Sequence, residues 1–176
     1  IVWICGGAWQ RMDKAAHLAY LGTLAQEGFV VASVEYRTSN EGTHPMQLCD
    51  IKAAIRYLRA YAKRYRINSE KFGVMGESAG GYLTCMAALD QDKKLDTGEY
   101  LEYSSQVQAA CPWYPPTDAS HFPYDDVEKA AMSSESLLMG FNVMTHPLEA
   151  YENSPVSKVT PDAPPFLLIH GTKDST

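Results

Sequence analysis

Short apolar runs alternate with helix-patterned stretches along this 176-residue chain. The runs are rich in β-branched and aromatic residues, which favour strands. Alternation of this kind is typical of a parallel sheet whose crossover helices pack on both faces. The sequence therefore predicts an α/β fold with a mostly parallel sheet. We expect its strands at Ile1–Ile4, Phe29–Tyr36, Lys71–Met75, Val107–Cys111 and Phe166–His170.

Helical patterns separate these strands. Asp13 is placed to cap a helix that runs through Glu27 and stops at Gly28, and another helix is expected from Ala79 through Leu89. Between them lies a helix with apolar residues at three- and four-residue spacing and cations on the opposite side, which we expect to face solvent. Its apolar residues are Leu48, Ile51, Ile55, Leu58 and Ala62, and its cations are Lys52, Arg56, Arg59 and Lys63.

Two segments lack a regular pattern. Gln91–Ser105 is polar and is predicted to be a loop. Residues 119–165 are rich in Pro, Ser and His and show no strand pattern, so we interpret them as an insertion with short helices that roofs an active site. Residues 1–176 are otherwise expected to form one domain, which is what the chain length favours.

Composition and charge exclude several classes of protein. The chain has 15 Lys and Arg residues against 21 Asp and Glu residues, and a net charge of −6 disfavours a nucleic-acid partner. The apolar runs are far too short to span a bilayer. Since no metal-ligand spacing or phosphate-binding loop is present, we predict neither a metal nor a cofactor. The four cysteines are expected to be small buried hydrophobes: Cys5, Cys49, Cys85 and Cys111.

The pattern G-x-S-x-G at residues 76–80 carries the strongest chemical signal. It lies between a predicted strand and a predicted helix, where a strained turn exposes the serine Oγ above the end of a sheet. Gly76 and Gly80 allow the strand and helix backbones to approach closely. The N-terminus of the following helix favours developing negative charge. These features predict that Ser78 is a nucleophile.

Two further elements match the needs of acyl transfer. A tetrahedral oxyanion requires backbone N–H donors placed in advance, and Gly7, Ala8 and Ala79 are the candidates, from the Gly-rich loop after the first strand and from the residue after Ser78. A carboxylate that orients a histidine is also needed. Asp174, in the loop after the last predicted strand, is the candidate acid.

The sequence resembles the esterase/lipase branch of the α/β-hydrolase superfamily, closest to its acetyl-esterase and feruloyl-esterase-like group and near the hormone-sensitive-lipase-like group. The resemblance covers essentially the whole chain. It is carried by ICGGAW (4–9), SVEYR (33–37), DIKAAIRYLR (50–59), GESAGGYL (76–83), YPPTD (114–118), NSP (153–155) and FLLIHGTKD (166–174).

This resemblance implies an α/β-hydrolase fold and supports the roles of Ser78 and Asp174. The family commonly has histidine and a third glycine where this chain has Cys5 and Ala8. Its catalytic histidine follows the acid by a few tens of residues, so we expect that residue beyond Thr176. We also expect the first strands of the fold to precede Ile1, which would make the domain incomplete at both ends.

The implied activity is hydrolysis of carboxylic esters through an acyl-enzyme, with a short-chain, acetyl or feruloyl-type acyl group on a small-molecule or carbohydrate-linked alcohol. Aromatic residues near the motif loops are candidates for the substrate pocket or, equally, for the core: Trp9, Tyr82, Trp113 and Tyr114. A prolyl-oligopeptidase-like serine peptidase and a non-catalytic binding protein on the same fold are the alternatives. Oligomeric state and compartment are left open.

Overall fold

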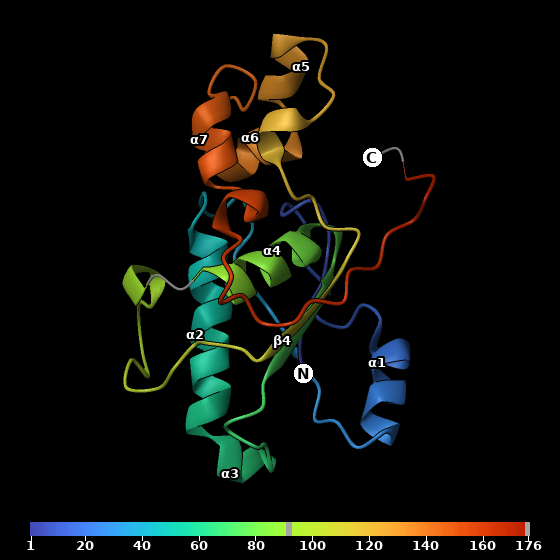
Figure 1. Cartoon of the computed structure of the whole chain (residues 1–176), viewed down its shortest axis with the longest axis vertical. Helices are drawn as coiled ribbons and strands as arrows, with labels where there is room; N and C mark the ends of the chain where they lie inside the picture. Colours follow the sequence, from blue (N-terminus) through green and yellow to red (C-terminus); the bar gives the residue numbers. More distant parts are fainter. Residues whose placement is uncertain (91–92, 175–176) are drawn as a thin grey trace.

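The computed structural model of the chain describes residues 1–90 and 93–174, and its centre is a parallel sheet (Figure 1). The strand order is β2-β1-β3-β4 and every pairing is parallel, so crossovers join the strands that follow one another in the chain. The predicted α/β class is therefore confirmed. The strands are β1 (Val2–Ile4), β2 (Ala32–Val34), β3 (Gly73–Glu77) and β4 (Ala109–Trp113).

Helices cover both faces of this sheet. α4 packs on β3 and β4 and also contacts α2, while α1 lies on the opposite side of the strands (Figure 1). The core is an apolar layer between the sheet and α2 and α4, and β1 lies within it, buried along its full length. The helices are α1 (Leu18–Gln26), α2 (Met46–Ala60), α3 (Ala62–Tyr65) and α4 (Ser78–Leu89).

Two predicted boundaries were wrong. Asp13 accepts a hydrogen bond from the N–H of Ala15 at 2.8 Å and so closes a turn, whereas α1 begins only after His17, whose φ is 64°. The predicted strand Phe29–Tyr36 is shorter because β2 is the outermost strand of the described sheet and pairs only with β1. Phe29 accordingly stays 53% exposed.

The last predicted strand, Phe166–His170, is only partly regular. It runs parallel to β4, with single bridges from Phe166 to Ala110 and from Ile169 to Trp113. Backbone bonds such as Leu167 N–H to Ala110 O (2.9 Å) hold it there. Its outer side is exposed to solvent in the described structure, since Leu167 and Leu168 are 61% and 62% exposed.

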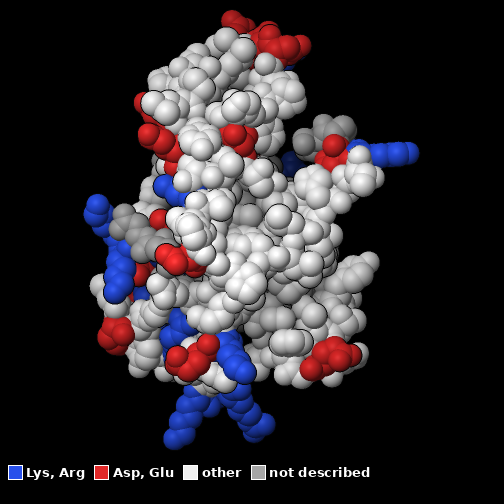
Figure 2. Space-filling model, in the orientation of Figure 1, with Lys and Arg blue, Asp and Glu red and all other residues white. Residues whose placement is uncertain are grey.

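The prediction that this helix turns its cations to solvent is confirmed for Lys63, which is exposed in α3, and is wrong for Lys52 and Arg56 of α2. The Lys52 side chain is 2% exposed and that of Arg56 is 0% exposed. Arg56 pairs with Asp96 at 2.9 Å and donates to the carbonyl of Thr97, because the segment after α4 folds over this side of the helix. Exposed cations gather instead around α3, where Figure 2 shows a basic end of the molecule that includes Lys63 and Arg64.

Short helices occupy the stretch between β4 and Phe166 and lie beyond one end of the sheet (Figure 1). Of the predicted loop at 91–105, Gln91 and Asp92 lie outside the described residues, and the remainder contains one 3-10 turn. The short elements are η1 (Lys93–Leu95), η2 (Ala119–His121), α5 (Val127–Ala131), α6 (Ser134–Met139), α7 (Pro147–Glu152) and η3 (Pro155–Lys158).

The cysteines are free thiols, and two of them, Cys5 and Cys85, are buried while Cys49 and Cys111 are half-buried. Burial raises the pKa of Cys85 to about 12, so this thiol stays protonated at neutral pH. In the part of the chain that the structure describes, we find no helix of the length and apolar character that crossing a bilayer requires.

Candidate active site

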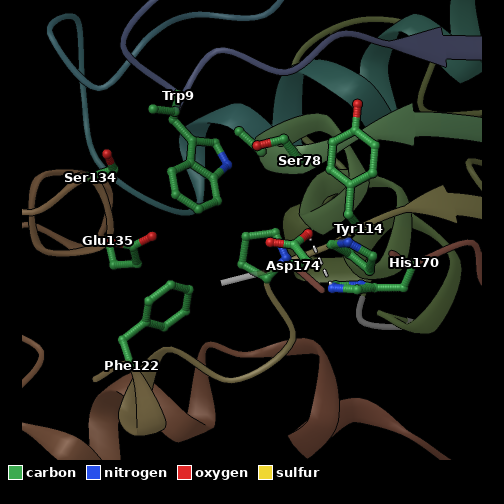
Figure 3. Close-up of a pocket in the computed structure, with 12 residues that line it drawn as sticks. Trp9, Ser78, Tyr114, Phe122, Ser134, Glu135, His170 and Asp174 are labelled. Atoms are coloured by element: carbon green, nitrogen blue, oxygen red, sulfur yellow. Dashed lines mark ion pairs between the residues drawn. The ribbon is translucent and has the colours of Figure 1, made fainter. Parts of the chain in front are cut away.

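Ser78 lies at the junction of β3 and α4, as the G-x-S-x-G pattern predicts. Its φ is 50°, in the left-handed region that a residue with a side chain seldom adopts. Strain of this kind is found where the surrounding structure enforces it, and it is frequent at functional sites. The turn leaves Ser78 half-buried and places its side chain in a cavity (Figure 3).

The two glycines of the turn are required by close backbone contacts. A Cβ built at Gly76 would lie 2.5 Å from the carbonyl oxygens of Ile4 and Gly80. A Cβ at Gly80 would lie 2.1 Å from the oxygen of Ile4 and 2.6 Å from that of Cys5. Because α4 thus begins against the end of β1, the turn has no room for a side chain at either position.

Substitution Gly80→Ala is expected to lower the free energy of unfolding by at least about 2–3 kcal/mol, because the β1 backbone must move to admit the methyl group. Gly22→Ala is the matched control. A Cβ at Gly22 meets nothing within 4 Å, so this change inside α1 should raise the free energy by about 0.5–1 kcal/mol. Urea unfolding of both variants checks the contrast, and equal stabilities would contradict it.

The Gly-rich loop after β1 contacts the serine turn directly. A Cβ at Gly6 would lie 2.9 Å from the carbonyl oxygen of Glu77 and 3.1 Å from Cβ of Ser78. Gly7 has a φ of 128°, and its carbonyl accepts hydrogen bonds from the N–H groups of Gln10 and Arg11. The loop therefore folds back as a compact turn against Ser78.

Ala8 occupies the position where the resemblance predicts a third glycine. Its φ is 55°, so the backbone adopts the left-handed conformation despite the Cβ. Ala79 is the second residue of α4 and lies in its first turn, where N–H groups have no acceptor within the helix. Both residues line the same cavity as Ser78, and they are therefore placed to offer donors to one oxyanion.

This cavity has a volume of about 420 Å³, within the range of about 300–1,000 Å³ that is usual for small-molecule sites. It brings together the predicted Ser78 and Asp174, which are far apart in the sequence (Figure 3). Its lining residues are Ala8, Trp9, Ser78, Ala79, Tyr114, Pro115, Pro116, Phe122, Ser134, Glu135, His170 and Asp174.

Two of the four aromatic pocket candidates, Tyr82 and Trp113, do not line the cavity. Trp9 and Tyr114 line the cavity. Tyr82 does not, because it is buried beneath Trp9 with ring centroids 5.3 Å apart, and its hydroxyl donates to the carbonyl of Asn153 at 2.7 Å. Trp113 turns to the other side of β4, where its ring meets that of Trp3 at 5.4 Å.

The sequence did not single out Phe122, Ser134 and Glu135, which the short helical segment contributes to the cavity. Ser134 and Glu135 lie in a polar run, a pattern that is typical of a solvent-exposed surface, yet Glu135 is only 7% exposed. A polar stretch that covers a site has no local periodicity that distinguishes it from an ordinary solvent-exposed stretch.

Glu77, the residue before the nucleophile, links the serine turn to two other elements. Its carboxylate contacts Nε2 of His17 at 2.7 Å, and the hydroxyl of Tyr114 donates to its other oxygen. Burial and this bond to Glu77 raise the pKa of Tyr114 to about 12. Tyr114 therefore remains protonated and holds its ring at the edge of the cavity.

Asp174 faces His170, with 3.3 Å between Oδ2 and Nε2. His170 lines the cavity, but the other histidines have partners elsewhere. His44 is half-buried near the hydroxyl of Tyr82, and its partial burial lowers its pKa to about 4. The His121 side chain is 81% exposed and pairs with Asp118. His17 contacts Glu77, and His146 contacts Thr145.

Comparison with known proteins agrees with this geometry. The BD-FAE family matches residues 1–176. The chain belongs to the BD-FAE family. LipM of Mycobacterium tuberculosis, a probable carboxylic ester hydrolase, is 31% identical over 176 residues, which is 98% of this chain and 40% of LipM. Esterase LipC of the same organism is 30% identical, over 99% of this chain and 44% of LipC. The chain thus spans about two fifths of the length of these curated relatives.

Solved structures of esterases share the fold of this BD-FAE chain. A truncated carbohydrate esterase from gut microbiota superimposes with a TM-score of 0.90 at 32% identity, over 99% of this chain and 67% of that one. Esterase 2 of Thermogutta terrifontis, phosphonylated by sarin, gives a TM-score of 0.81 at 27% identity, over 99% and 62%. The predicted α/β-hydrolase fold is therefore confirmed.

No cluster of three or more His, Cys, Asp or Glu side chains suited to a metal ion occurs within residues 1–90 and 93–174. The polar residues that line the cavity include one serine at a strained turn, a second serine, two carboxylates and a histidine. This set of side chains is suited to nucleophilic acyl transfer.

Proposed function

We propose that the protein hydrolyses carboxylic esters, with Ser78 as nucleophile and Asp174 as the acid of the catalytic triad. The observation that carries this proposal is the strained turn at Ser78, which opens into the same cavity as Asp174 and the oxyanion loop. The esterase names of LipM and of the similar gut-microbiota structure support the same chemistry.

In the proposed reaction, Ser78 Oγ attacks the ester carbonyl while a histidine base accepts its proton. The carbonyl oxygen becomes an oxyanion, which the N–H groups of Ala79, Ala8 and Gly7 stabilise. Collapse of the tetrahedral intermediate breaks the bond to the alcohol, which leaves with the proton from the histidine. Water then attacks the acyl-enzyme by the same steps and releases the acid, which restores the hydroxyl of Ser78.

We place the histidine base beyond Thr176, since Ser, acid and His follow one another in that order in this fold. Asp174 would orient that imidazole and stabilise its protonated form. His170 precedes the acid and contacts it at 3.3 Å. We assign His170 the role of holding the Asp174 carboxylate in the cavity.

The proposed substrate has a small acyl group, acetyl or a compact aryl acid, on a carbohydrate-like alcohol. The cavity of about 420 Å³ suits such a group, and its walls from the short helical segment carry Ser134 and Glu135. A lipase would instead present a broad apolar surface to lipid. The similarity to a carbohydrate esterase from gut microbiota favours the same substrate class.

We expect the full-length protein to hydrolyse p-nitrophenyl acetate and butyrate with a kcat/KM at least about tenfold above that for the palmitate, because a long chain exceeds the cavity. The measurement is a series of initial rates at matched ester concentrations. Acetylated xylan and a proline p-nitroanilide are assayed beside it.

A preference for palmitate over acetate would contradict the assigned acyl group. Faster cleavage of the proline anilide than of every ester would favour the peptidase alternative. If no ester or anilide turns over while esters still bind, the non-catalytic binding protein is supported in place of the enzyme.

A further inference from the structure

Glu135 is a buried carboxylate that faces the proposed active site. It is the second residue of α6, is only 7% exposed, and lines the cavity that contains Ser78. Figure 3 shows its side chain directed into the space between Trp9, Phe122 and Asp174. A carboxylate in such a place is costly unless its oxygens accept hydrogen bonds.

Only one oxygen of Glu135 is engaged within the described part of the chain. The hydroxyl of Tyr124 donates to Oε2 at 2.5 Å. Oε1 has no hydrogen-bond donor among residues 1–90 and 93–174. The carboxylate is not needed to cap α6, because Oγ of Ser133 accepts from the N–H of Ser136 at 3.1 Å. The arrangement therefore leaves Oε1 available to a ligand.

The neighbours of Glu135 add a polar hydroxyl and an apolar aromatic ring to this side of the cavity. Ser134, the preceding residue, also lines the cavity and contributes a hydroxyl that both donates and accepts. Phe122 lies on the same side (Figure 3), and its ring stacks on that of Tyr124 at 6.0 Å with an interplanar angle of 18°. Tyr124 thus orients both the carboxylate and the aromatic ring.

We propose that Glu135 and Ser134 form a subsite for neighbouring hydroxyl groups of a polyhydroxylated alcohol, the portion of the ester that leaves from Ser78. Oε1 of Glu135 accepts from one hydroxyl, and Oγ of Ser134 donates to the next. The ring of Phe122 packs against the C–H face between them. This assignment rests on the proposed function and adds the residues that select its alcohol.

A polyol fits this pair of groups better than a cationic alcohol does. An ammonium or guanidinium group only donates hydrogen bonds, so it satisfies Glu135 but offers no acceptor to Ser134. Each hydroxyl of a diol donates and accepts, which satisfies both side chains. Since Tyr124 already donates to Oε2, the carboxylate needs one further neutral donor to be well paired.

The test measures a selectivity ratio in the full-length protein: kcat/KM for a monoacetylated methyl xyloside divided by kcat/KM for p-nitrophenyl acetate, which has no hydroxyls. Glu135→Gln is expected to lower this ratio by about 10- to 100-fold, mainly through KM, because a charged acceptor becomes neutral. Ser134→Ala should lower it about fivefold. That variant preserves α6, whose cap is Ser133.

Glu128→Gln is the matched control, since Glu128 is an exposed glutamate of α5 outside the cavity and should leave the ratio within twofold. An unchanged ratio in both Glu135→Gln and Ser134→Ala would overturn the subsite, as would an equal loss on both esters. Preferential hydrolysis of acetylcholine over the xyloside, abolished by Glu135→Gln, would assign a cation subsite instead. If the unmodified protein hydrolyses no ester at all, the proposed function itself fails.

Discussion

Replacing Ser78 with alanine is expected to lower kcat/KM for p-nitrophenyl acetate by about 10⁴-fold or more, because removal of the nucleophile disables the triad as a unit. The fold should survive this change. Ser78 is held at a φ of 50°, which alanine also tolerates at a cost of about 1–2 kcal/mol or less. Initial rates of the purified full-length variant, with a melting curve as the check on folding, give the result.

Ser69→Ala is the control for this experiment, since Ser69 lies in a turn outside the cavity and should retain full activity. A fluorophosphonate probe provides a second measurement. It should add its mass to the peptide that contains Ser78 and leave the Ser78→Ala variant unlabelled. The assignment would be wrong if Ser78→Ala kept more than a tenth of the activity or took up the probe at another serine.

Arg56→Ala is expected to lower the free energy of unfolding by about 3–5 kcal/mol, since it breaks a buried ion pair and, among the described residues, leaves Asp96 with only its longer contact to Lys52, at 3.6 Å. The Arg56 side chain is fully buried and bonds to Asp96 as well as to the carbonyl oxygens of Thr97 and Glu99. Without it, the carbonyl oxygens of Thr97 and Glu99 lose this donor and a cavity opens beside α2. Urea unfolding of the full-length protein measures the change.

Lys63→Ala provides the comparison because Lys63 is an exposed cation of α3. Its loss should change the free energy of unfolding by no more than about 0.5 kcal/mol. Similar effects of the two substitutions would contradict the buried network. Activity toward p-nitrophenyl acetate, measured below the unfolding transition, separates a loss of stability from a loss of the site.

Much of the architecture could be predicted from local pattern. The apolar runs placed β1, β3 and β4 to within a few residues, and the spacing of Leu48, Ile51 and Ile55 placed α2 and its buried face. The predicted boundaries of α1 and β2 were wrong because the ends of these elements depend on the segments that pack or pair with them. An outer strand such as β2 pairs only where its neighbour extends.

In the candidate site, too, some residues could be assigned from local sequence and others only from the packing. Gly76, Ser78 and Gly80 could be assigned from sequence because their spacing expresses a local steric demand, a turn that admits no side chain. Nothing local distinguished Trp9 and Tyr114, which line the cavity, from Tyr82 and Trp113, which do not. All four are aromatic residues near motif loops, and only the packing separates them.

The α/β class, the position of Ser78 and the glycines around it follow from local patterns, because periodicity and backbone sterics act over a few residues. The burial of Arg56 and the direction of Glu135 toward the cavity became clear only from the folded chain. Each depends on a segment distant in the chain, the loop at 96–99 for Arg56 and the serine turn for Glu135. Burial is a property of what covers a residue, and its own sequence neighbourhood does not specify it.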